Sequence, residues 1–201
     1  MAVPDEQTGL DQFRLTRPLI VEVLRLTCAN MQEFNRRFVR PYEVRLGNKN
    51  MSEILGKVLE TNAAIVFSRG VGYEVRKESS DQDPDLLFTR LNRPLEVKVT
   101  STSTGWTGGE FSKRPFDYLL ISWDKKSLYD SYFAALVHLE KPDWESRMAK
   151  DYYGPSFTVR RLAEKKNRID FVGSIGKGTR GGIRLFWENV LSDPSTQVRL
   201  S

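Results

Sequence analysis

The stretch DPDLLFTRLNRPLEVKVT, residues 83–100, decides the fold class of this chain. Its two runs of branched and large apolar residues, DLLFTR and PLEVKVT, flank turn residues near Leu91 and Asn92. Such a pattern predicts an antiparallel hairpin. Side chains alternate between the two faces of a strand. The apolar residues of LEVKV (95–99) should therefore face the core, while Glu96 and Lys98 should face the other side.

The predicted hairpin gathers opposite charges in one patch. With the turn centred there, Asp85 lies across from Lys98 or Val99, and neighbouring strands are about 4.8 Å apart. Asp85 and Glu96 repel one another at such a distance unless a cation lies between them. Oxygen ligands suit Mg²⁺, which keeps several waters when a protein binds it. A magnesium ion held here can support phosphodiester hydrolysis, with Lys98 orienting or deprotonating the attacking water or stabilising the transition state.

Pro84-Asp85, followed on the next strand by Glu96-Val97-Lys98, resembles the PD-(D/E)XK motif of a nuclease superfamily. Within that superfamily the chain is similar to Type II restriction endonucleases. The resemblance implies an α/β fold with a central mixed β-sheet flanked by helices. It also implies Mg²⁺-dependent hydrolysis of double-stranded DNA at a specific sequence, with Asp85 and Glu96 as metal ligands and Lys98 serving the attacking water.

Two assignments have competitors. Asp83 lies near Asp85, but only Asp85 follows the proline and leads directly into the apolar strand, which favours it. Many members of the superfamily carry a further glutamate on a helix near the metal. Glu53 and Glu60 are candidates, because they are seven residues apart and lie on a similar helical face. Glu53 resembles the family position better and is the predicted catalytic residue, although an N-terminal capping box would explain it equally well.

Apolar periodicity and turn residues predict the remaining elements. One helix begins near Thr16 and Pro18 and stops at Pro41, and a second begins near Asn50 and precedes SRGVG (68–72). Further strands are expected in the runs GYEVRKESS, FDYLLISW, SYFAALVHLE, FTVRRL and RIDFVGSI. We expect a single nuclease domain over residues 1–201, with a flexible segment at residues 1–14.

The composition excludes several other classes of protein. One cysteine and one histidine (Cys28 and His138) exclude a disulfide framework and a Cys/His zinc site. Any histidine-dependent nucleophile would rest on His138 alone, and a strand residue with a structural partner is the better interpretation. No apolar run approaches the roughly 18 residues of a membrane-spanning helix. The polar N-terminus also lacks the features of a secretory signal. We therefore expect a soluble cytoplasmic protein without a membrane partner.

The net charge of +5 has an uneven distribution. Residues 156–184 hold eight basic and two acidic residues, a surplus of six. Such a surplus is typical of a surface that follows phosphates, and also of a solvated face. The loop TGWTGGEFSKRP (104–115) adds two basic residues after the hairpin. The predicted DNA contacts are Lys113, Arg114, Arg160, Arg161, Lys165, Lys166, Lys177 and Arg180.

The sequence therefore predicts a Mg²⁺-dependent Type II restriction endonuclease. One hairpin supplies one metal site, whereas a palindromic duplex has a two-fold axis, so a homodimer is the expected assembly. Two alternatives share these features. One is a repair or junction-resolving nuclease of the same fold, and the other is a non-catalytic DNA-binding module.

Overall fold

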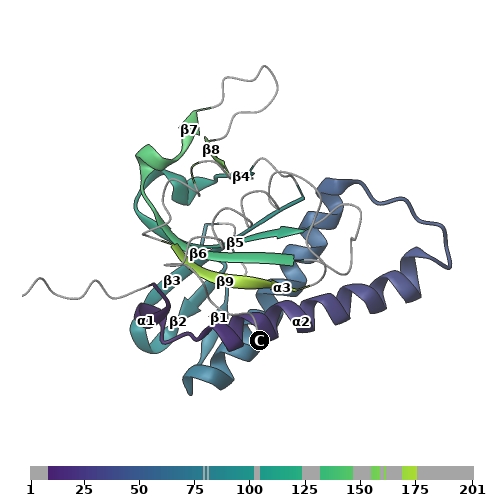
Figure 1. Ribbon diagram of the computed structural model, residues 1–201, viewed down its shortest axis with the longest axis horizontal. Coiled ribbons are helices and arrows are strands. Elements are labelled where there is room, and N and C mark those ends of the chain that lie inside the picture. The colour runs from purple at the N-terminus through teal and green to yellow at the C-terminus, as the bar shows by residue number, and fades with distance from the viewer. Residues whose placement is uncertain are drawn as a thin grey trace, which may run out of the picture.

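The protein has a central mixed β-sheet with helices on one face and a smaller sheet on the other (Figure 1). The computed structural model describes residues 9–78, 80, 82–101, 105–123, 132–146, 155–158, 161 and 169–175. The predicted α/β class, with a mixed sheet flanked by helices, is confirmed. No helix within these residues is long and apolar enough to cross a membrane.

Six strands form the central sheet in the order β1-β2-β3-β5-β6-β9. Their bounds are β1 Val75–Lys77, β2 Leu86–Phe88, β3 Arg93–Thr100, β5 Phe116–Trp123, β6 Tyr132–Leu139 and β9 Ile169–Ile175. β3 and β5 run parallel, whereas the other neighbouring pairs are antiparallel. In β5, Leu119 and Ile121 face the helices, while Tyr118 and Leu120 face the smaller sheet. Because β5 is buried on both faces, its sequence is a nearly continuous apolar run.

The helices are α1 Gly9–Phe13, α2 Arg17–Phe34 and α3 Asn48–Val71, and a π-helix, η1 Asn35–Val39, continues α2. α2 begins where predicted, with Thr16 as its N-cap and Pro18 in the first turn, where a missing N–H is tolerated. α3 ends at Gly72, whose φ of 74° is the left-handed conformation that glycine adopts readily. α3 begins two residues before the predicted Asn50, with Gly47 as N-cap and no side-chain cap, so Glu53 forms no capping box.

The larger hydrophobic core lies between the sheet and the helices. Phe13, Phe67 and Phe88 are fully buried in it, and the ring centroids of Phe13 and Phe88 lie 4.9 Å apart. Phe13 belongs to α1, so the prediction of a flexible segment at residues 1–14 is wrong for residues 9–13. Two apolar residues in that short helix are enough to bury it against the sheet, whereas residues 1–8 lie outside the described part of the chain.

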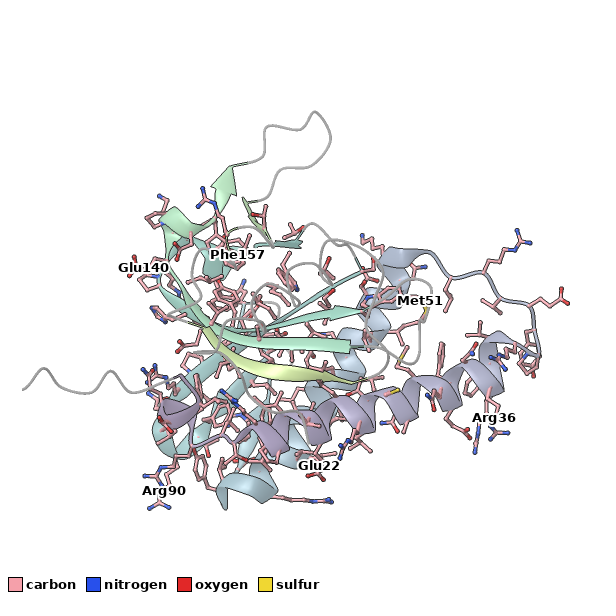
Figure 2. The ribbon with its side chains drawn as sticks, in the orientation of Figure 1. Glu22, Arg36, Met51, Arg90, Glu140 and Phe157 are labelled. Carbon is pink, nitrogen blue, oxygen red and sulfur yellow. The ribbon has the colours of Figure 1, made fainter. Side chains whose placement is uncertain are left out.

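A small sheet covers the opposite face of the central sheet. Its strands, in the order β4-β8-β7, are β4 Gly105–Thr107, β8 Pro155–Thr158 and β7 Glu145–Ser146. Trp106 donates a 2.8 Å hydrogen bond from Nε1 to the carbonyl oxygen of Ile121, and Phe157 lies between the two sheets (Figure 2). Gly105 has a φ of 152°, and a Cβ there would lie only 2.3 Å from the carbonyl oxygen of Phe157. Short 3-10 helices, η3 Glu110–Lys113 and η4 Lys141–Asp143, complete this layer.

Candidate active site

The predicted hairpin is present as β2 and β3, but its register differs from the prediction. Leu86 pairs with Leu95, so Asp85, one residue ahead of β2, comes opposite Glu96. We expected Asp85 two to three residues further along β3. That expectation is wrong, and the observed register brings the two carboxylates closer to one another than the predicted one.

The turn explains the shift in register. Thr89–Leu91 forms a short 3-10 helix, η2, and Asn92 follows it with a φ of 47°. Asparagine tolerates this left-handed conformation better than most residues. The turn between β2 and β3 is therefore centred between Arg90 and Leu91, one residue earlier than its composition indicated.

Asp85 is held in place by the backbone of β3. Its Oδ2 accepts a 2.8 Å hydrogen bond from the backbone N–H of Val97, and its own carbonyl oxygen accepts one of 3.1 Å from Glu78 on the β1 side. Asp85 is half-buried, whereas its competitor Asp83 is exposed. The geometry therefore places Asp85, rather than Asp83, against the strand that carries Glu96 and Lys98.

Glu96 is a buried carboxylate with one free oxygen. The residue is only 5% exposed. Its Oε1 accepts a 2.5 Å hydrogen bond from Nζ of Lys98, while Oε2 is buried without a partner among the described residues. Burial raises the pKa of Glu96, Lys98 opposes that rise, and the negative charge of Asp85 adds to it. The nearby cation, Lys98, therefore does not fully offset the cost of burying an ionised carboxylate at Glu96.

The face that carries Glu96 is closed by Tyr118, its neighbour in the parallel β3–β5 ladder. Tyr118 is fully buried, and its hydroxyl also has no hydrogen-bond partner among the described residues. Burial raises the pKa of Tyr118, and the nearby charge of Glu96 raises it further. The free oxygen of Glu96 is therefore shielded from bulk water by a large aromatic side chain.

Lys98 is not the solvated strand-face lysine that the alternation of β3 indicated. Its side chain is 23% exposed, because the chain after β4 passes close to it: a Cβ on Gly109 would lie 3.6 Å from Nζ of Lys98. The ammonium group therefore lies between the carboxylate of Glu96 and the loop that precedes η3.

Glu60, on α3, is a third carboxylate of this cluster. It is 5% exposed, and its Oε2 lies 3.1 Å from Nζ of Lys57 and 3.3 Å from Nζ of Lys77. Burial raises the pKa of Glu60, and the charge of Asp85 raises it further, against the effect of the two lysines. Lys77, which pairs with Glu60, lies opposite Leu86, the residue that follows Asp85, so α3 brings the carboxylate of Glu60 to the Asp85 side of the hairpin.

Glu53, the predicted helix glutamate, lies elsewhere. Its side chain is 64% exposed and pairs at 3.8 Å with Lys49. α3 crosses the sheet so that Ser52 accepts a hydrogen bond from Trp123, the last residue of β5, whereas Glu60 is two turns further along, near Asp85. Glu53 therefore lies near the carboxyl ends of the parallel strands β3 and β5, away from Asp85. The structure brings Glu60, not Glu53, to the side of the hairpin that holds Asp85.

The predicted DNA-binding residues that the structure describes already have partners in the protein. Lys113 pairs with Glu110 at 2.6 Å, and the guanidinium of Arg114 stacks on the rings of Phe111 and Phe116. Nη1 of Arg161 donates 2.9 Å hydrogen bonds to two backbone carbonyl groups of η4. Five predicted contacts lie outside the described residues: Arg160, Lys165, Lys166, Lys177 and Arg180.

His138 belongs to a separate polar group. Its Nδ1 lies 2.8 Å from Oδ1 of Asp117, and the other oxygen of Asp117 pairs at 3.2 Å with Arg93. Asp117 precedes Tyr118 in β5, so the two residues face opposite sides of the sheet. His138 has a structural partner, as expected, on the face opposite Glu96.

No protein-family model matches this chain, and no curated protein matches it either.

Proposed function

We propose that this protein is a Mg²⁺-dependent endonuclease of the PD-(D/E)XK kind that hydrolyses phosphodiester bonds of double-stranded DNA. One observation carries the proposal. Glu96 is a buried carboxylate that pairs with Lys98, feels the charge of Asp85 and keeps one oxygen without a partner among the described residues. Asp85 and Glu96 lie opposite one another across the β2–β3 hairpin and repel one another, so their proximity costs stability unless a cation lies between them.

The side chains present include the carboxylate oxygens that magnesium prefers as ligands. A buried acceptor without a partner costs about 1–3 kcal/mol, which a cation at Oε2 of Glu96 would offset. Among the described residues, no three His, Cys, Asp or Glu side chains form a ready metal centre. Mg²⁺ requires few protein ligands, since it keeps several waters. Asp85 and Glu96 would hold it, and Glu60, close to Asp85, would add negative charge.

The chemistry that Mg²⁺ supplies when bound is neutralisation of phosphate charge and activation of water. The residues of the chain then have distinct tasks. Val97 fixes the orientation of the Asp85 carboxylate through its backbone N–H. Lys98, held by Glu96, either orients and deprotonates the attacking water or stabilises the negative charge that develops on the phosphate. Tyr118 excludes bulk water beneath Glu96 and so strengthens these electrostatic effects.

Within this proposal, a restriction endonuclease is the particular activity that the sequence resemblance supports. Such an enzyme would act in the cytoplasm, and as a homodimer it would cut both strands of a palindromic site. Digestion of genomic DNA into discrete bands would support this activity. A nuclease that cuts without sequence preference, or only at junctions and lesions, would support the repair alternative.

Cleavage of a supercoiled plasmid with different metal ions tests the proposal. We expect nicking and linearisation with Mg²⁺ or Mn²⁺, none with excess EDTA, and binding with little cleavage in Ca²⁺, a larger ion with looser geometry. The double variant Asp85→Asn/Glu96→Gln, nearly isosteric and less charged, is the matched control and should not cut. Full activity of that variant, or of the wild type in EDTA, would exclude this site.

A further inference from the structure

The chain carries a projecting segment that the candidate active site does not use. α2 extends past the ends of the central strands, and residues 40–47 return the chain to the start of α3 (Figure 1). We call residues 36–49 the basic arm. Its sequence, RRFVRPYEVRLGNK, contains five basic residues and one acid, a surplus of four.

Large apolar side chains in the basic arm are exposed to solvent. Phe38 is 57% exposed, Tyr42 is 74% exposed and Val44 is 43% exposed. The arm is nevertheless anchored to the protein, since Phe34 and Leu46 pack against the main core and the rings of Phe34 and Phe38 lie 5.8 Å apart. A π-helix, a rare form that is frequent at functional sites, carries Phe38.

The charges of the basic arm are partly balanced. Arg36 lies 2.6 Å from Glu33 and Arg37 contacts the same carboxylate, so two guanidinium groups share one negative charge. Arg36 points away from the sheet at the far end of α2 (Figure 2). Arg40 and Arg45, on either side of Tyr42, are both exposed. Even when Glu33 and Glu53 are counted with the arm, five basic residues face three acids.

Exposed aromatic rings between exposed arginines match the surface of single-stranded DNA. Guanidinium groups bind phosphates, and aromatic rings stack on bases. The bases of an intact duplex are already stacked on one another, so only an unpaired base is free to meet Phe38 or Tyr42. A self-associating surface is less suitable, because a two-fold axis there would bring two positively charged arms together.

We propose that the basic arm binds a single-stranded stretch of DNA, with Phe38 and Tyr42 stacking on unpaired bases while Arg40 and Arg45 contact phosphates. The choice of DNA over other polyanions rests on the proposed function. The substrate would then contain an unpaired segment, such as an overhang, flap or junction, next to the duplex that is cut, which is the substrate of the repair alternative rather than of a restriction endonuclease.

Binding measured in EDTA, where no cleavage is expected, tests the basic arm separately from the chemistry. The probes are a fluorescent single strand, a blunt duplex and the same duplex with a single-stranded overhang. Phe38→Ala/Tyr42→Ala should weaken binding of the single strand and the overhang by about 10-fold or more, and leave the blunt duplex unchanged. Arg40→Gln/Arg45→Gln should lower the slope of log K against log salt for the single strand by about 1.4.

Ile65→Ala/Arg69→Gln, which removes an exposed apolar and an exposed basic residue from α3, is the matched control and should bind as the wild type does. Unchanged binding of all three probes by the aromatic variant would overturn the inference, as would an equal loss on the blunt duplex. Sedimentation in which that variant dissociates a dimer without altering DNA binding would overturn it in favour of self-association. A wild type that shows arm-dependent binding but never cuts with Mg²⁺ would refute the proposed function and leave the inference standing.

Discussion

The carboxylate of Asp85 accepts the backbone hydrogen bond of Val97 that a residue of a neighbouring strand would otherwise accept. The β2–β3 ladder ends at the pair Leu86–Leu95, and two residues further along β3 the N–H of Val97 donates to Oδ2 of Asp85 at 2.8 Å instead. Asp85 therefore has a structural task beside its proposed metal-binding one. The two tasks require different atoms, so substitutions can separate them.

Asp85→Ala should destabilise the protein by about 1–3 kcal/mol, because it leaves the N–H of Val97 without a partner. Asp85→Asn keeps an amide oxygen that can accept this hydrogen bond and should lose clearly less stability. Both variants should lose cleavage, since neither has the carboxylate charge. Urea unfolding and single-turnover cleavage measure the two effects. Equal stability of the two variants would show that the hydrogen bond contributes nothing.

Lys98→Met should reduce the single-turnover cleavage rate by about 10²-fold or more. Because Lys98 is largely buried beside Glu96, the variant should also lose stability at neutral pH, on the order of 3 kcal/mol for a buried charge left without its partner. The double variant Lys98→Met/Glu96→Gln should recover much of that stability while remaining inactive, which a double-mutant cycle can measure. If the Lys98→Met variant cuts at the wild-type rate, the hairpin is not part of the active site.

Glu60 should make the stability of the protein depend on pH. Its pKa is raised above the ordinary value of 4.5, first by burial and then by Asp85. The folded protein thus holds this proton more tightly than the unfolded chain, so the stabilising contribution is full at low pH and is lost as the pH rises through the raised pKa. Glu60→Gln should therefore melt at a higher temperature than the wild type at neutral pH.

Thermal melting of both proteins from acid to neutral pH measures this difference, and the exposed Glu53→Gln is the control. The melting temperatures of the Glu60→Gln variant and the wild type should diverge as the pH rises, while those of Glu53→Gln should follow the wild type. Curves that stay parallel for Glu60→Gln would mean that Glu60 has no raised pKa. Addition of Mg²⁺ should narrow the difference, because a cation near Asp85 favours ionised carboxylates.

His138→Asn should cut DNA at nearly the wild-type rate. His138 pairs with Asp117 on the face of the sheet opposite Glu96, so it cannot reach the proposed reaction centre. A rate reduced by two orders of magnitude in His138→Asn would indicate histidine-based chemistry instead.

Local patterns predicted the hairpin because they depend on neighbours in the sequence. The inward positions of Leu95 and Val97 follow from strand alternation and are confirmed. The register was missed because it depends on the backbone conformation of Asn92, which composition does not specify. Glu60 was missed in favour of Glu53 because helical spacing gives the face of a helix but not where the helix crosses a sheet.

Features built from distant segments were not predicted. The run FTVRRL predicted a strand that overlaps β8, but the sequence indicated neither β4 nor its pairing with β8, which joins segments about 50 residues apart. The burial of Lys98 follows from this layer, so the sequence could not reveal it. The basic arm has a recognisable sequence pattern, because arginines alternate with apolar residues in RRF, RPY and EVR. Its exposure became evident only with the fold, because the helical pattern alone would place Phe38 in the core.

The parallel pairing of β3 with β5 should affect the order in which the protein folds. Glu60, Asp85, Glu96 and Lys98 belong to α3 and the β2–β3 hairpin, which are close in the chain and can form early, whereas β5 joins only after the crossover through β4 and η3. Until β5 and Tyr118 arrive, the carboxylate of Glu96 should remain hydrated. Its dehydration would then oppose a late step, and we expect Glu96→Gln to fold faster than the wild type.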